Sequence, residues 1–138
     1  MLFNPEESVR LEGDTGPFIQ YSYARISSIR RKAVAQGVVE ATDFSTLTDL
    51  QATEAELIQQ LAGYAAVVAE AARTLSPAVV AQYAYDVAKS YNRFYTEVPI
   101  FAETDPLKKA FRVALSAKTA EAIKTSLGLL GIEVPERM

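Results

Sequence analysis

Three prolines stand where helices are predicted to begin, and they constrain the fold of this chain more than any other feature. Pro17, Pro77 and Pro106 each open a segment with apolar residues at helical spacing. Proline is favoured in the first turn of a helix because its missing N–H would have no partner there. Ser76 and Asp105 directly precede two of these prolines and are suited to cap the free N–H groups.

The helical spacing extends over four segments. We predict helices over about 17–36, 54–75, 77–96 and 106–131. Along each segment one stripe of mostly apolar residues should face a common core. In chain order, these predicted core residues are Ile19, Ser22, Ile26, Ile29 and Ala33; Leu57, Leu61, Tyr64, Val68 and Ala72; Val80, Ala84, Val87, Tyr91 and Phe94; and Leu107, Ala110, Phe111, Ala114, Leu115, Ala117, Ile123, Leu127 and Leu130. With no β-hairpin signal and no internal repeat, the sequence predicts an all-α bundle of four main helices.

Composition excludes several classes of function. The 138 residues suit one domain, and they include neither cysteine nor histidine. Disulfides, thiolate metal sites and the usual Ser-His and Cys-His nucleophile pairs are therefore excluded. No run of about 18 apolar residues is present, and the N-terminus does not resemble a signal peptide, so we expect a cytoplasmic protein. Residues 1–13, interrupted by Pro5 and Gly13, are predicted to be a connector, and residues 14–138 the helical domain.

Charge is unevenly distributed along the chain. The formal net charge is −3, which is unusual for a nucleic-acid binder. Residues 14–36 nevertheless carry Arg25, Arg30, Arg31 and Lys32 against the single carboxylate of Asp14. Positive charge is thus concentrated on the first predicted helix.

A second stripe on that helix combines aromatic and cationic side chains. It consists of Phe18, Tyr21, Arg25, Ser28 and Lys32, at alternating intervals of three and four. RNA recognition uses such side chains, because unpaired bases stack on rings and guanidinium planes while cations hold phosphates. The alternative is that the aromatics belong to the core and the cations to a solvated face.

The third predicted helix repeats the pattern. Tyr85, Lys89 and Asn92 lie at i, i+4 and i+7, off the core stripe, with Arg93 and Tyr95 beside them. An aromatic, a cation and an amide on one face could contact an unstacked base. The alternative is a surface tyrosine with a locally bonded amide.

Other charged clusters suggest weaker candidates. Glu54 and Glu56 have no partner that indicates catalysis, so solvated carboxylates are expected there. A basic patch of Lys108, Lys109 and Arg112 at the start of the fourth helix is either a solvated face or a phosphate contact. The two glycines of Gly13–Pro17 lack the lysine and Ser/Thr of a phosphate-binding loop.

Three blocks of the sequence resemble the C-terminal helical domain of arginyl-tRNA synthetases. "GDTGPFIQYSYARISSIRRK" is similar to the segment that opens that domain, and "YAYDVAKSYNRFYTEVPIF" to a later helix of the family. "LGLLGIEVPERM" closely resembles the family's last residues, including the terminal methionine. The blocks occur in order and cover nearly the whole chain. The resemblance implies an all-α anticodon-binding domain of the DALR type from a class I aminoacyl-tRNA synthetase.

The resemblance also implies roles for particular residues. Phe18, Tyr21 and Arg25 would lie against the anticodon loop of tRNA(Arg), and Tyr95 and Met138 would line the pocket for the anticodon bases. Position 18 is Phe where many members have Tyr, which preserves stacking but removes the phenol. Together with the residues chosen from the pattern, the predicted RNA-binding set is Phe18, Tyr21, Arg25, Lys32, Tyr85, Lys89, Asn92, Tyr95 and Met138.

The resemblance further implies that the ATP- and arginine-binding catalytic domain of the family precedes this region. We therefore expect a fragment that cannot activate arginine alone, has no cofactor or metal of its own, and depends on ATP only within the full-length ligase. Its expected partners are the tRNA(Arg) anticodon stem-loop and the catalytic domain of the same parent chain, without a membrane. A different hypothesis is a helical protein–protein interaction module without an RNA role, in which Ala65, Ala66 and Ala69 form an exposed docking face.

Overall fold

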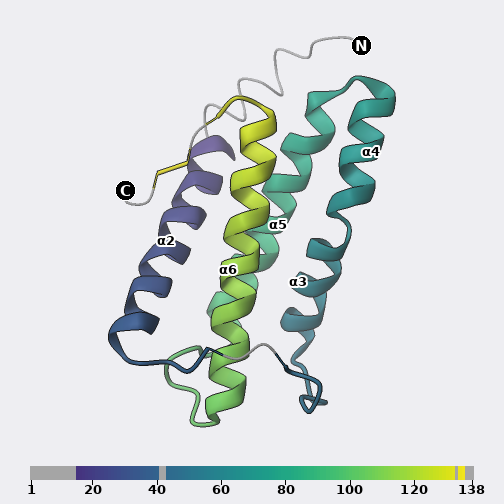
Figure 1. Ribbon diagram of the computed structural model, residues 1–138. Helices are drawn as coiled ribbons and strands as arrows, with labels where there is room; N and C mark the ends of the chain where they lie inside the picture. Colours follow the sequence, from purple (N-terminus) through teal and green to yellow (C-terminus); the bar gives the residue numbers. More distant parts are fainter. Residues whose placement is uncertain (1–14, 41–42, 133, 136–138) are drawn as a thin grey trace.

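The computed structural model describes residues 15–40, 43–132 and 134–135, and these residues form a bundle of helices (Figure 1). The helices are α2 (Thr15–Ala35), α3 (Ala52–Ala62), α4 (Tyr64–Thr74), α5 (Pro77–Glu97) and α6 (Pro106–Leu129). No strand occurs in the described part of the chain. The all-α prediction is confirmed, and the predicted connector 1–13 lies outside the described residues.

Helix α5 lies at the centre of the bundle. It packs against α2, α6, α3 and α4, while α3 and α4 follow one another along its length (Figure 1). The central position of α5 agrees with its buried stripe, because Val80, Ala84, Val87, Tyr91 and Phe94 are all at most 5% exposed. The predicted stripe of α2 is likewise buried from Ile19 to Ala33. These two stripes supply much of the hydrophobic core.

The proline-led starts of α5 and α6 are confirmed. Pro77 and Pro106 each occupy the first turn of their helix. The Asp105 carboxylate accepts hydrogen bonds from the backbone N–H groups of Leu107 (2.9 Å) and Lys108 (3.4 Å). Ser76 is the N-cap residue of α5, although its side chain makes no capping hydrogen bond.

The predicted single helix over 54–75 is divided at Gly63. The Gly63 N–H donates to the carbonyl oxygens of both Gln59 and Gln60, each at 3.2 Å, so the last turn of α3 tightens before α4 begins. In α4 no described residue is buried. The predicted core residues Leu61, Tyr64 and Val68 are half-buried, and Ala72 is exposed. The division allows α3 to bury Leu57 while α4 lies on the edge of the bundle.

Two predictions about charged residues are wrong. Glu54 was expected to be solvated, but it is 2% exposed, and its Oε2 accepts a hydrogen bond at 3.2 Å from Nε of Arg112. Arg112 was expected to join an exposed basic patch, yet it is 3% exposed. Lys108 from the same patch forms an ion pair at 3.0 Å with Asp49. Two of the three cations of the patch are therefore paired with carboxylates within the protein.

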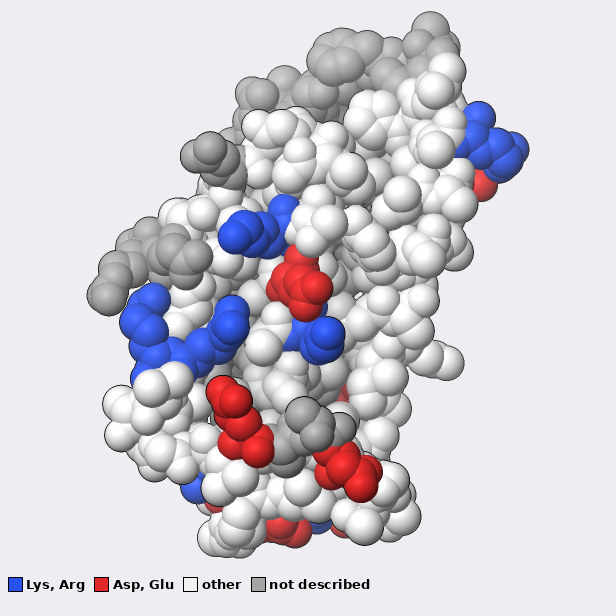
Figure 2. Space-filling model, viewed as in Figure 1, with Lys and Arg blue, Asp and Glu red and all other residues white. Residues whose placement is uncertain are grey.

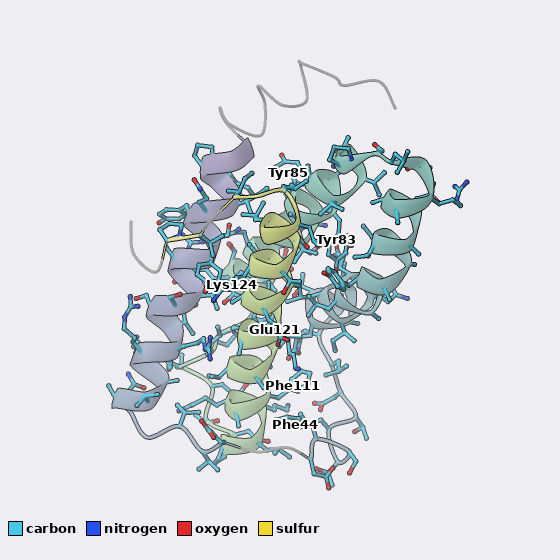
Figure 3. The ribbon with its side chains drawn as sticks, turned by 45° about the horizontal axis from the view of Figure 1, so that its top comes forward. Phe44, Tyr83, Tyr85, Phe111, Glu121 and Lys124 are labelled. Carbon is cyan, nitrogen blue, oxygen red and sulfur yellow. The ribbon has the colours of Figure 1, made fainter. Side chains whose placement is uncertain are left out.

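The loop between α2 and α3 packs back onto α6. Phe44 lies against Phe111, with ring centroids 5.2 Å apart in an edge-to-face arrangement (Figure 3). The Lys108–Asp49 ion pair adds a second attachment of this loop to the start of α6. In the part of the chain that the structure describes, no helix is long and apolar enough to cross a membrane.

Candidate nucleic-acid interface

A cleft of about 940 Å³ opens between α2, the end of α5 and the loop that connects α5 to α6. Its lining residues are Tyr21, Ala24, Arg25, Ser28, Ile29, Arg31, Lys32, Tyr95, Thr96, Ile100 and Phe101. Three of these are cations, and no carboxylate is found among the described residues of the lining. The cleft is therefore suited to an anion despite the net negative charge of the chain.

Arg25 is held between two tyrosine rings in the lining of this cleft. Its guanidinium carbon lies 5.0 Å from the ring centroid of Tyr21 and 4.5 Å from that of Tyr95. Both distances are within the range of a cation–π interaction. Tyr21 is 49% exposed and Tyr95 41% exposed, so each ring still presents apolar surface to solvent. The arrangement combines stacking surfaces with a cation at one place.

Asn92 fixes the guanidinium from the side of the bundle. Its Oδ1 accepts a hydrogen bond of 2.6 Å from Nη1 of Arg25, and its Nδ2 donates to Oγ of Ser22 and to the carbonyl oxygen of Ala88, each at 2.7 Å. Ser22 in turn donates to the carbonyl oxygen of Phe18 at 2.9 Å. The amide of Asn92 is thus used within the protein, and it links α2 to α5 behind Arg25.

A second cation–aromatic pair lies further along the cleft. Nζ of Lys32 is 4.5 Å from the ring centroid of Phe101. Lys32 comes from the last turn of α2, and Phe101 from the loop between α5 and α6. Ile100, next to Phe101, is buried and anchors the loop in the core. The loop therefore contributes an aromatic wall to a cleft whose other walls are helical.

Tyr95 is supported from behind by Tyr91. Their rings are stacked with centroids 6.5 Å apart, and the Tyr91 hydroxyl is 2.9 Å from Oγ of Ser116. Tyr91 is fully buried, and burial raises the pKa of its phenol. A neutral, buried ring therefore backs the exposed ring of Tyr95 and restricts its orientation.

The structure divides the predicted RNA-binding residues into two groups. Tyr21, Arg25, Lys32 and Tyr95 line the cleft, and Asn92 lies directly behind them. Three others form a separate cluster, in which Phe18 contacts Tyr85 edge to face at 5.8 Å and Nζ of Lys89 lies 4.8 Å from the Tyr85 ring. Met138 lies outside the described residues. An RNA contact by any of these residues stays a prediction.

Arg31, Thr96, Ile100 and Phe101 also line the cleft but were not among the predicted RNA-binding residues. Arg31 belongs to the same basic run as Lys32, so its charge was the available signal. Phe101 follows Pro99 in a segment without helical spacing, and the sequence contains no pattern that pairs it with Lys32. Its place in the cleft follows from the tertiary fold.

Surface charge differs between the elements on the face with α6 in front. Lys and Arg side chains gather over α2 (Figure 2). On α6 the single acidic residue, Glu121, lies between Lys118 and Lys124 in sequence. The helix α4 shows a mostly uncharged surface in this view (Figure 2). The predicted Ala65, Ala66 and Ala69 of α4 are exposed. Their exposure is confirmed, but it identifies no partner.

The site is therefore a cationic, tyrosine-lined cleft in an all-α domain. The chain belongs to the DALR anticodon-binding domain family, whose model matches residues 19–138.

The chain is also similar to three named proteins, two by sequence and one by structure. An arginine–tRNA ligase of Parabacteroides distasonis is 50% identical over all 138 residues, and that of Flavobacterium psychrophilum is 54% identical. The chain spans 23% and 22% of the length of these two proteins. The solved arginyl-tRNA synthetase of Thermus thermophilus matches 99% of this chain and 23% of its own, with a TM-score of 0.79 and 36% identity.

Proposed function

We propose that this chain recognises the anticodon loop of an arginine tRNA as one domain of an arginine–tRNA ligase. The observation that carries the proposal is the guanidinium of Arg25 between the half-exposed rings of Tyr21 and Tyr95, in a cleft lined by cations. The family membership and the names of the relatives support it.

The cleft offers each component that an unpaired nucleotide needs. The exposed surfaces of Tyr21 and Tyr95 provide stacking platforms for bases. Arg25, Arg31 and Lys32 supply positive charge for the phosphates between these bases. Asn92 holds Arg25 in place, so part of the order required in the complex exists before RNA binds. We propose that Asn92 acts mainly through Arg25, and that Phe18, Tyr85 and Lys89 support the platform from the neighbouring cluster.

Binding of a fluorescent anticodon stem-loop from an arginine tRNA, followed by anisotropy, tests the proposal. Tyr21→Ala and Arg25→Ala should each weaken binding by about 1–3 kcal/mol, the free energy of one stacked base. Arg73→Ala is the matched control, because Arg73 is an exposed arginine paired with Glu70 on α4. Unchanged affinity in both cleft variants would contradict the proposal.

The activation of arginine with ATP is proposed to reside in the part of the relatives that this chain does not match. The 138-residue chain alone should then show no arginine-dependent exchange of pyrophosphate into ATP. Measurable exchange would show that arginine activation does not require the part of the relatives that this chain does not match.

A further inference from the structure

Arg112 joins three separate segments from inside the bundle. The residue lies on α6 and is 3% exposed. Its Nε donates to Oε2 of Glu54 on α3 at 3.2 Å. Its Nη1 donates to Oε1 of Glu103 at 2.7 Å and to the backbone carbonyl of Pro99 at 2.8 Å. Two of its three partners therefore belong to the loop between α5 and α6.

That loop forms one wall of the cleft. Pro99, whose carbonyl Arg112 holds, directly precedes Ile100 and Phe101, and both of these residues line the cleft. Nζ of Lys32 also lies over the ring of Phe101. A displacement of the loop would thus move the ring of Phe101 and separate it from Lys32, a cation that we assign to RNA binding.

We propose that Arg112 is a positioning residue for the cleft: it sets the place of Phe101 through the carbonyl of Pro99 and the carboxylate of Glu103. The effect on RNA rests on the proposed function, whereas the effect on Phe101 does not. Planar geometry explains why an arginine is required, because a guanidinium directs several N–H groups to fixed places and an ammonium is a single point charge.

A purely structural role makes a different prediction. In that role Arg112 only pairs with the buried carboxylate of Glu54, and disrupting a buried ion pair destabilises the folded state whatever the conformation of the cleft. Loss of this pair would lower the melting temperature and leave the environment of Phe101 unchanged in the folded protein. A fluorescent probe at residue 101 can therefore distinguish the positioning role from the purely structural role.

Phe101→Trp provides this probe, since the sequence contains no other tryptophan. In this background, acrylamide quenching reports the exposure of Trp at position 101, and anisotropy reports affinity for the anticodon stem-loop. Arg112→Lys is expected to raise the quenching constant at least twofold and to weaken RNA binding at least threefold, with unchanged far-UV circular dichroism. Glu103→Gln, which retains the pair between Arg112 and Glu54, should act in the same direction with a smaller effect.

Tyr83→Phe is the matched control for lost stability. The Tyr83 hydroxyl bonds the carbonyl oxygen of Gln60, and Tyr83 does not line the cleft. The control should lower the melting temperature without changing either readout. If Arg112→Lys folds and its quenching constant is unchanged, the positioning role is overturned. If Arg112→Lys does not fold, an unchanged quenching constant in Glu103→Gln overturns the positioning role. Increased quenching with unaltered RNA affinity overturns the link to binding. A wild-type protein that binds no stem-loop contradicts the proposed function alone.

Discussion

Arg25 shows how single residues combine to form the candidate site. Its guanidinium is positioned by two rings and one amide, and the amide is itself fixed by Ser22 and Ala88. A long, flexible side chain is thereby held in one place on a partly exposed surface. Such order reduces the entropy that binding would otherwise lose.

A double-mutant cycle tests whether Asn92 affects RNA binding through Arg25. If Asn92 acts through Arg25, Asn92→Ala should weaken RNA binding in the wild-type protein and have little further effect once Arg25→Ala is present. The expected coupling is about 0.5–3 kcal/mol, the range for residues in direct contact. Anisotropy titrations of the four proteins measure it. Additive losses would show that Asn92 contacts RNA independently of Arg25.

Tyr83 predicts a loss of stability at high pH. It is 5% exposed, and burial raises the pKa of its phenol from 10.0 to about 12. The folded state therefore favours the neutral phenol, so its contribution is complete below pH 10.0 and is lost as the pH rises towards 12. Urea unfolding between pH 9 and 12 should show a steeper decline for the wild type than for Tyr83→Phe. An equal decline of stability with pH in both proteins would contradict the raised pKa of Tyr83.

At the scale of single elements, the segment between residues 52 and 74 is divided at Gly63. Its N–H is shared between two preceding carbonyls, and α3 and α4 meet there instead of forming one helix. The helical spacing of apolar residues predicted the helical conformation correctly on both sides. The division itself depends on packing, because α3 contributes to the core while α4 remains at its edge.

Two glycines with equal free space should respond oppositely to the same substitution. Gly37 follows α2 with φ +67°, whereas Gly128 lies within α6; an added Cβ would meet nothing within 4 Å at either position. Gly37→Ala should destabilise the protein by about 1 kcal/mol, because alanine is strained at positive φ. Gly128→Ala should stabilise it by up to about 1 kcal/mol through higher helix propensity.

Urea unfolding of the two variants measures these changes in the free energy of unfolding. A stability gain in Gly37→Ala would show that α2 does not end in the left-handed turn described. A loss in Gly128→Ala would show that the end of α6 lacks the free space found around it.

At the scale of the whole molecule, α5 determines which surfaces can act together. Because it packs on α2 as well as on α6, its tyrosine and asparagine side chains lie beside the basic helix. The cleft gathers three cations in a chain whose formal net charge is −3. Local placement, and not total charge, therefore makes the cleft suited to an anion.

Much of the fold could be predicted from the sequence because its signals are local. Proline in the first turn, a capping carboxylate at Asp105 and apolar residues at intervals of three and four depend only on neighbours within a few residues. They correctly predicted the starts of α5 and α6 and the buried stripes of α2 and α5. The stripe of Tyr21, Arg25 and Lys32 was recognisable for the same reason.

Contacts between elements could not be predicted in this way. Arg25 and Asn92 are 67 positions apart, and Arg112 and Glu54 are 58 apart, so their pairing depends on how the helices are rotated and shifted against one another. The sequence by itself determined the starts of α5 and α6 and the buried faces of α2 and α5. Only the tertiary structure decided that Phe101 lines the cleft and that Arg112 is buried, because helix packing brings distant side chains within bonding distance.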